Sequence, residues 1–64
     1  EYYKYLMGFV EEWGNTKETF DHLVSIVKAE YQKAFPRMSD IGALDKAVTY
    51  VNEMYRFYGL KQPF

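Results

Sequence analysis

The sequence predicts an all-α fold, a small three-helix bundle. Apolar residues recur at the three- and four-residue spacing of a helix in three segments, about residues 2–13, 17–34 and 41–58. Gly14 and Pro36 interrupt the chain between these segments, and no segment alternates polar and apolar residues as a strand does. Three helices with short links pack as a compact bundle.

The first two predicted helices each carry an apolar stripe. In the segment 2–13 the stripe is Tyr2, Leu6, Phe9, Val10 and Trp13, and in the segment 17–34 it is Phe20, Leu23, Val24, Val27, Tyr31 and Ala34. Asn15 or Thr16 is suited to cap the second helix, since both are favoured N-cap residues. We expect that helix to end before Pro36, because proline disfavours helical backbone in the residue that precedes it.

The third predicted helix, about 41–58, follows Ser39 and Asp40, either of which can cap it. Gly59 is suited to the position just past its end. Its apolar stripe comprises Ile41, Leu44, Val48, Val51, Tyr55 and Tyr58. We therefore expect a core that includes Trp13, Leu44, Val48, Val51 and Tyr55.

Composition excludes several classes of protein. The chain of 64 residues forms one domain, 1–64, and it opens on Glu1 rather than Met, so we interpret it as part of a longer or processed protein. A net charge of −1 gives no general attraction to nucleic acid or to membrane surfaces. No apolar run approaches the ~20 residues of a membrane span. Cysteine is absent, which fits a reducing compartment, and we expect a cytoplasmic protein.

A second apolar stripe predicts a contact surface. Tyr50, Met54 and Phe57 lie beside the stripe assigned to the core on the third helix, and Tyr3, Met7 and Ile26 stand away from the stripes of the other two. Tyrosine and methionine are enriched in the cores of protein interfaces. These six residues predict a protein–protein interaction module, and a homodimer is its simplest form.

Two alternatives stay open. Three short helices must each meet two neighbours, which widens every apolar stripe, so the second stripe could also be core. The domain could instead be a helix-turn-helix that binds nucleic acid through its third helix. The residues on the polar arc of that helix would then contact bases and phosphates: Lys46, Thr49, Asn52 and Arg56.

Residues for chemistry are sparse. Glu18 and His22 share a helix face and could touch one metal ion, but a structural zinc site normally needs four ligands and the chain has one histidine. Ser25 lies three residues from His22, yet no nucleophile elbow or glycine-rich phosphate loop is present. We therefore expect no catalytic residues, no metal site and no cofactor.

Overall fold

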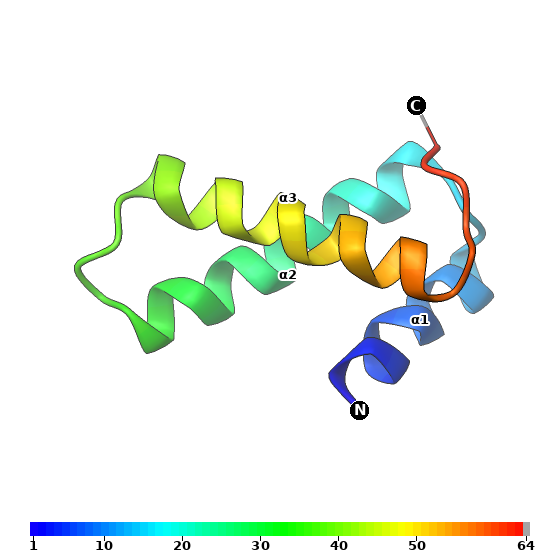
Figure 1. Cartoon of the computed structure of the whole chain (residues 1–64), viewed down its shortest axis with the longest axis horizontal. Helices are drawn as coiled ribbons and strands as arrows, with labels where there is room; N and C mark the ends of the chain where they lie inside the picture. The colour runs from blue at the N-terminus through cyan, green and yellow to red at the C-terminus, as the bar shows by residue number, and fades with distance from the viewer. Residues whose placement is uncertain (64) are drawn as a thin grey trace.

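The computed structural model describes residues 1–63 and confirms the three-helix bundle (Figure 1). Its helices are α1 (Tyr2–Trp13), α2 (Lys17–Ala34) and α3 (Asp40–Phe57). Helices α2 and α3 run antiparallel and side by side, whereas α1 crosses the pair near the end where α2 begins. The molecule is elongated along the α2–α3 pair, with extents of 33 × 24 × 18 Å.

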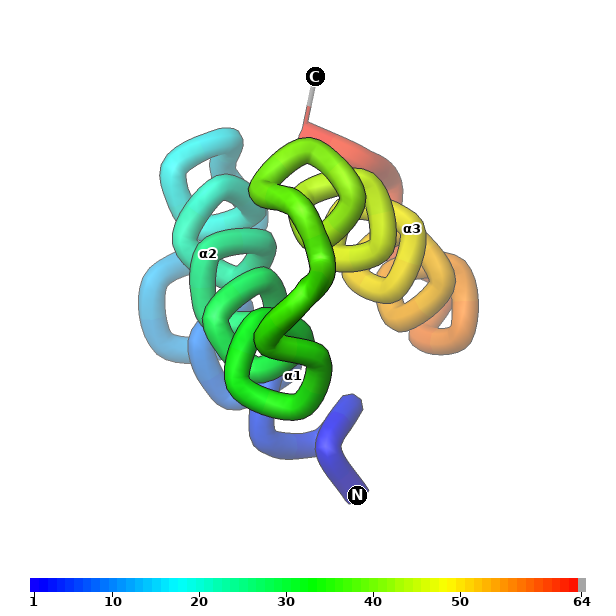
Figure 2. The backbone as a smooth tube through the Cα atoms, turned by 90° about the vertical axis from the view of Figure 1, so that its left-hand side faces the viewer, coloured from blue at the N-terminus to red at the C-terminus, as the bar shows by residue number. Residues whose placement is uncertain are grey.

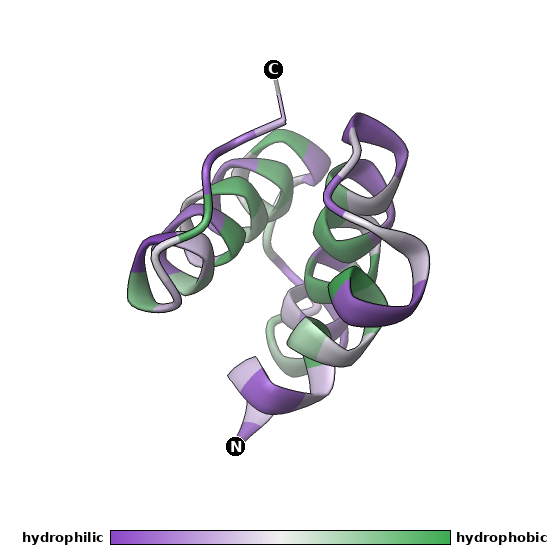
Figure 3. Ribbon diagram, turned by 90° about the vertical axis from the view of Figure 1, so that its right-hand side faces the viewer, coloured by the Kyte–Doolittle hydropathy of each residue, from purple (hydrophilic) through white to green (hydrophobic). Residues whose placement is uncertain are grey.

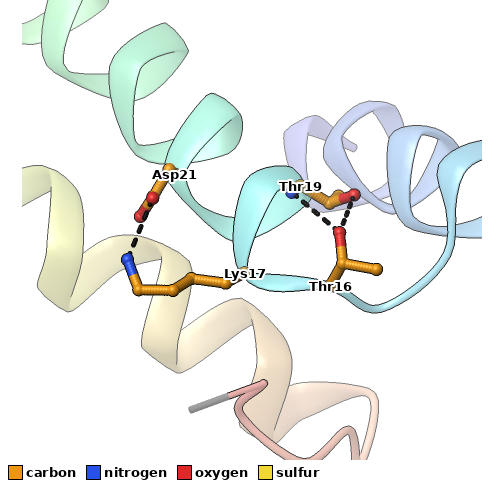
Figure 4. Close-up of polar contacts among 4 residues, drawn as sticks. All are labelled: Thr16, Lys17, Thr19 and Asp21. Carbon is orange, nitrogen blue, oxygen red and sulfur yellow. Dashed lines mark hydrogen bonds and ion pairs between the residues drawn. The ribbon is translucent and has the colours of Figure 1, made fainter.

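Side-chain caps fix the starts of the two long helices. The Thr16 hydroxyl accepts a hydrogen bond from the Thr19 amide at 3.2 Å and is hydrogen-bonded to the Thr19 hydroxyl at 3.1 Å (Figure 4). The Ser39 hydroxyl accepts a hydrogen bond from the Gly42 amide at 3.0 Å. Thr16 and Ser39 are thus the caps, rather than Asn15 and Asp40. Each bond satisfies one of the amides that the first turn of a helix leaves without a partner.

A glycine turn ends α3 and returns the chain to the core. Gly59 has a φ of +70°, a left-handed conformation that favours glycine. The Leu60 amide donates to the Tyr55 carbonyl at 2.8 Å and the Gly59 amide to the Arg56 carbonyl at 3.1 Å, which is the Schellman pattern. Leu60 packs against the core, and the Asn15 side-chain amide donates to the Lys61 carbonyl at 2.8 Å. The tail is therefore tied to the α1–α2 link.

The core lies where all three helices meet. Hydrophobic segments of α2 and α3 face one another across the pair (Figure 3). The buried cluster confirms the predicted stripe of α2 over its first eleven residues and part of the other two stripes. Its members are Leu6, Val10, Phe20, Leu23, Val24, Val27, Ala47, Val51, Met54 and Tyr55, and Ala43 is also fully buried.

The core face of α3 is rotated by roughly 60° about the helix axis from the predicted stripe, in which Val51 and Tyr55 are confirmed as core. Ile41 is 81% exposed and Leu44 is 45% exposed, while Val48 is only half-buried. The buried line runs instead through Ala43, Ala47, Val51, Met54 and Tyr55. Ala43 and Ala47 are small, and small side chains on a buried line leave room for the backbone of a neighbouring helix to approach.

The shortness of α1 leaves part of the pair uncovered. Helix α1 has 12 residues and α2 has 18, or about 18 and 27 Å at 1.5 Å per residue. Viewed from the α2–α3 link, the first residues of α1 lie below the pair (Figure 2). No residue of α2 between 28 and 34 is fully buried, and Ala34 is exposed against expectation. Trp13, which was predicted to be core, is half exposed at the end of α1.

Candidate aromatic contact site

Four rings from α1, the second half of α3 and the residue that caps α3 form one continuous group, which we call the α1–α3 aromatic surface: Tyr3, Tyr50, Phe57 and Tyr58. The ring centroid of Tyr3 lies 5.2 Å from that of Tyr50 and 5.4 Å from that of Phe57. Phe57 lies 5.1 Å from Tyr58 at an interplanar angle of 88°. These edge-to-face and tilted contacts are the arrangements that aromatic pairs prefer. The surface therefore has a defined shape.

The α1–α3 aromatic surface is unequally exposed. Phe57 is 70% exposed although two rings touch it, and Tyr58 is also exposed. Tyr3 and Tyr50 are half-buried and pack against the core. The inner rings are thus anchored in the fold, while the outer ones face solvent.

The other predicted contact residues do not extend this surface. Met54 is 0% exposed and belongs to the core, so its assignment as a partner contact was wrong. The physical reason is the rotation of α3, which places Met54 in the core. Met7 and Ile26 are half-buried and pack against the core as well. Of the three residues predicted on α3, only Phe57 is largely exposed.

A second run of rings follows α1 on its α2 side; the sequence placed Tyr2, Phe9 and Trp13 in the core stripe of this helix and left Tyr5 out of it. Tyr5 contacts Phe9 at 5.5 Å, Phe9 contacts Trp13 at 5.1 Å, and Trp13 contacts His22 of α2 at 4.9 Å. Tyr2 joins this run to the α1–α3 aromatic surface, because its ring lies 5.7 Å from Tyr5 and 5.8 Å from Tyr50. The spacing of 2, 5, 9 and 13 along a helix was the available signal.

The imidazole of His22 packs against aromatic rings. Its ring lies against Phe9 and Trp13, and among residues 1–63 no group of three or more metal-ligating side chains converges. The Ser25 hydroxyl donates to the His22 backbone carbonyl at 2.7 Å rather than to its imidazole. The arrangement therefore holds His22 as part of an aromatic cluster.

Tyrosine hydroxyls at the core are poorly solvated. Among the described residues, the buried hydroxyls of Tyr2 and Tyr55 have no hydrogen-bond partner. Burial raises the pKa of Tyr55, and it raises the pKa of Tyr2 with a further contribution from the nearby carboxylate of Glu30. Burial, together with Tyr3 and Tyr31, likewise raises the pKa of Tyr50. These tyrosines stay neutral at physiological pH.

The residues predicted for nucleic-acid contact lie on the outer side of α3. Lys46, Thr49 and Arg56 are exposed, and Asn52 is half-buried and accepts a hydrogen bond from Gln62. Asp45 and Glu53 are exposed on the same helix and match Lys46 and Arg56 in number. This arc therefore carries no net positive charge with which to attract phosphates.

Comparisons with known proteins give no relative. No family model matches the chain, and no curated protein or solved structure is significantly similar to it. Within residues 1–63, no helix is long and apolar enough to cross a bilayer. Function is therefore inferred from the geometry of the chain.

Proposed function

We propose that this domain is a protein–protein association module that forms a homodimer through the α1–α3 aromatic surface. The observation that supports the proposal most directly is the position of Phe57. Its ring is 70% exposed, yet it is held between the rings of Tyr3 and Tyr58, so its conformation is set before any partner arrives. A preorganised aromatic side chain loses little entropy on binding.

The size of the molecule fits such a role. A standard interface buries about 800 Å² on each partner, which would be about a sixth of the accessible surface of 4617 Å². The aromatic surface would form the apolar centre of that area. The exposed charged residues Glu53 and Arg56 on the same helix would then lie at the rim, where interfaces are polar.

Sedimentation equilibrium over a wide range of concentration, at low and moderate salt, tests the proposal. We expect a mass near twice the 7.7 kDa of the chain. The Phe57→Ser variant should be monomeric with unchanged helix content by circular dichroism, because an exposed side chain contributes little to folding. A dimer centred on apolar contacts should persist at moderate salt.

Two further variants serve as controls. Ile41→Ser removes an even more exposed apolar side chain at the opposite end of α3, so it should leave the dimer intact. Met54→Ser should instead lower the free energy of unfolding by about 3 kcal/mol or more, because it opens a cavity in the core and places a hydroxyl there. A wild-type chain that stays monomeric at every concentration contradicts the proposal. Dissociation by Ile41→Ser but not by Phe57→Ser would contradict the proposed surface.

A further inference from the structure

A hollow of about 260 Å³ opens where α1 stops covering the α2–α3 pair. Four of its lining residues are aromatic. Tyr2, Tyr31 and Tyr50 come from α1, α2 and α3, and Phe35 follows directly after α2. Val27, which is almost completely buried, lies among the lining residues, and Glu30 contributes the carboxylate. Pockets for drug-sized ligands measure about 300–1,000 Å³, so this hollow suits a group of fewer atoms.

The rings of the hollow are held in pairs. Tyr2 and Tyr50 lie 5.8 Å apart at an interplanar angle of 51°, and Tyr31 and Phe35 are stacked at 6.3 Å. Tyr2, Tyr31 and Tyr50 also pack against the core, so the walls do not depend on an occupant for their position. The face of an aromatic ring carries partial negative charge and attracts cations.

The electrostatics of the hollow also favour a positive charge. The Glu30 carboxylate is exposed, and the one ion pair within residues 1–63 joins Lys17 to Asp21 (Figure 4), so Glu30 has no cationic partner there. Ala34 and the C-cap residue Phe35 lie at the C-terminal end of α2, where the helix dipole is negative and is partly offset by Lys33 in the last turn. Burial and the charge of Glu30 both raise the pKa of Tyr2, so this wall resists further negative charge.

The apolar walls favour a cation whose charge is surrounded by apolar groups. A bare ammonium is strongly hydrated. Its entry into the hollow would cost desolvation free energy, and a single carboxylate would compensate only a small part of that cost. A methylated ammonium carries the same charge behind methyl groups, which are easily desolvated and pack against rings and against Val27. Recognition of such groups by aromatic cages is a known use of cation–π attraction.

We propose that this hollow is an aromatic cage for a methylated ammonium group, carried either by a lysine side chain of another protein or by a free quaternary amine. The cage shares Tyr50 with the α1–α3 aromatic surface, but it includes neither of the outer rings, Phe57 and Tyr58.

Titration of the whole chain with tetramethylammonium, followed by nuclear magnetic resonance, tests the cage. We expect saturable shifts at the amides of Val27, Tyr31 and Ala34, and an upfield shift of the probe's methyl protons from the ring currents. The uncharged molecule tert-butanol, of similar size, should bind at least about fivefold more weakly. Equal binding of the two probes would show a merely apolar hollow, and the absence of saturation would also overturn the proposal.

Variants identify the site without unfolding the protein. Phe35 is more than half exposed and lies outside the buried core, so Phe35→Leu should weaken binding several-fold while Phe35→Tyr, which keeps a ring face, should retain it. Glu30→Gln should also weaken binding, whereas the matched change Glu53→Gln on the outer side of α3 should not. Unchanged affinity in both Phe35→Leu and Glu30→Gln would rule out this hollow as the site.

The two sources of the ligand can be distinguished with a probe that carries the aliphatic stem of a lysine side chain. N-acetyl-trimethyllysine amide should bind more tightly than tetramethylammonium if the cage receives a lysine side chain, because the aliphatic stem adds contacts. Equal affinities would support a free amine as the ligand. Unmodified N-acetyl-lysine amide should bind more weakly than the trimethylated form, and a reversal of that order would contradict the cage.

Discussion

Tyr55 combines a fully buried ring with a hydroxyl that has no partner among residues 1–63. Its ring lies 5.3 Å from that of Phe20 at 76°, so the packing is well formed. A buried hydroxyl without a hydrogen bond has lost its hydrogen bonds to water and has gained none within the protein, which lowers the stability of the fold. At this position the aromatic ring stabilises the fold and the hydroxyl destabilises it.

Removal of that hydroxyl should therefore stabilise the protein. We expect Tyr55→Phe to raise the free energy of unfolding by about 1 kcal/mol at neutral pH, measured by urea denaturation. Tyr58→Phe, in which the side chain is exposed, is the matched control and should change little. A loss of stability in Tyr55→Phe would mean that the hydroxyl is satisfied.

The same residue predicts a loss of stability at alkaline pH. Burial raises the pKa of Tyr55 above the ordinary 10.0, so the unfolded chain releases this proton at a lower pH than the folded chain. Its contribution is fully present below pH 10.0 and declines as pH rises from there through the folded pKa. Tyr55→Phe should flatten this decline, and an equal decline in both proteins would contradict the assignment.

Which residues of α3 are buried could be predicted only in part from the sequence. Large apolar side chains such as Ile41 and Leu44 predict a core because they have much surface to bury. The structure buries Ala43 and Ala47 instead, on the same line as Val51, Met54 and Tyr55. Helical periodicity identified an amphipathic helix, but the face that meets a neighbour depends on the distance between helices, which no local pattern contains.

At the scale of elements, the helix boundaries were predictable because their signals are local. Thr16, Ser39 and Gly59 each act through backbone groups within five residues, and the structure uses all three. The predicted third helix, about 41–58, differs by one residue at each end from Asp40–Phe57. The hollow was not predictable, since its rings come from separate helices. Only the (i, i+4) spacing of Tyr31 and Phe35 hinted at it.

Two glycines inside helices should respond differently to alanine. A Cβ at Gly8 would meet no atom within 4 Å, so Gly8→Ala should raise the free energy of unfolding by about 0.5–1 kcal/mol through higher helix propensity. At Gly42 the Cβ would lie 3.1 Å from the Ser39 hydroxyl, which caps α3.

Thermal unfolding of the two variants checks this contrast. We expect Gly42→Ala to give no gain, because the crowded Ser39 hydroxyl must move from its bond to the Gly42 amide. An equal gain in both variants would show that the cap accommodates the methyl group. Neither substitution touches the α1–α3 aromatic surface, so both proteins should keep the association state of the wild type.

At the scale of the whole molecule, the two ends of the α2–α3 pair are unequally supported. The buried residues of α2 are Thr19, Phe20, Leu23, Val24 and Val27, all in its first eleven residues. Beyond them, residues 28–34 are half-buried or exposed. The far end of the pair, residues 28–34 and 40–46, depends largely on contacts between two helices rather than three.

Native-state hydrogen exchange should detect this gradient. Amides near Val24 and Val51 should exchange only through global unfolding, whereas those of residues 28–34 should exchange by local opening with lower protection. Tetramethylammonium in the hollow should slow exchange in residues 28–34, because it stabilises only the closed form. Equal protection along the whole of α2 would contradict the gradient.

The contact between Trp13 and His22 provides the molecule with a built-in optical reporter. The chain has one tryptophan, at the end of α1, and its ring lies 4.9 Å from an imidazole of α2. Its emission therefore follows the docking of α1, while the far-ultraviolet signal is dominated by the two longer helices. Unlabelled protein thus supplies two independent signals, and their coincidence or separation during denaturation distinguishes a single cooperative unit from a helical pair with a detachable third helix.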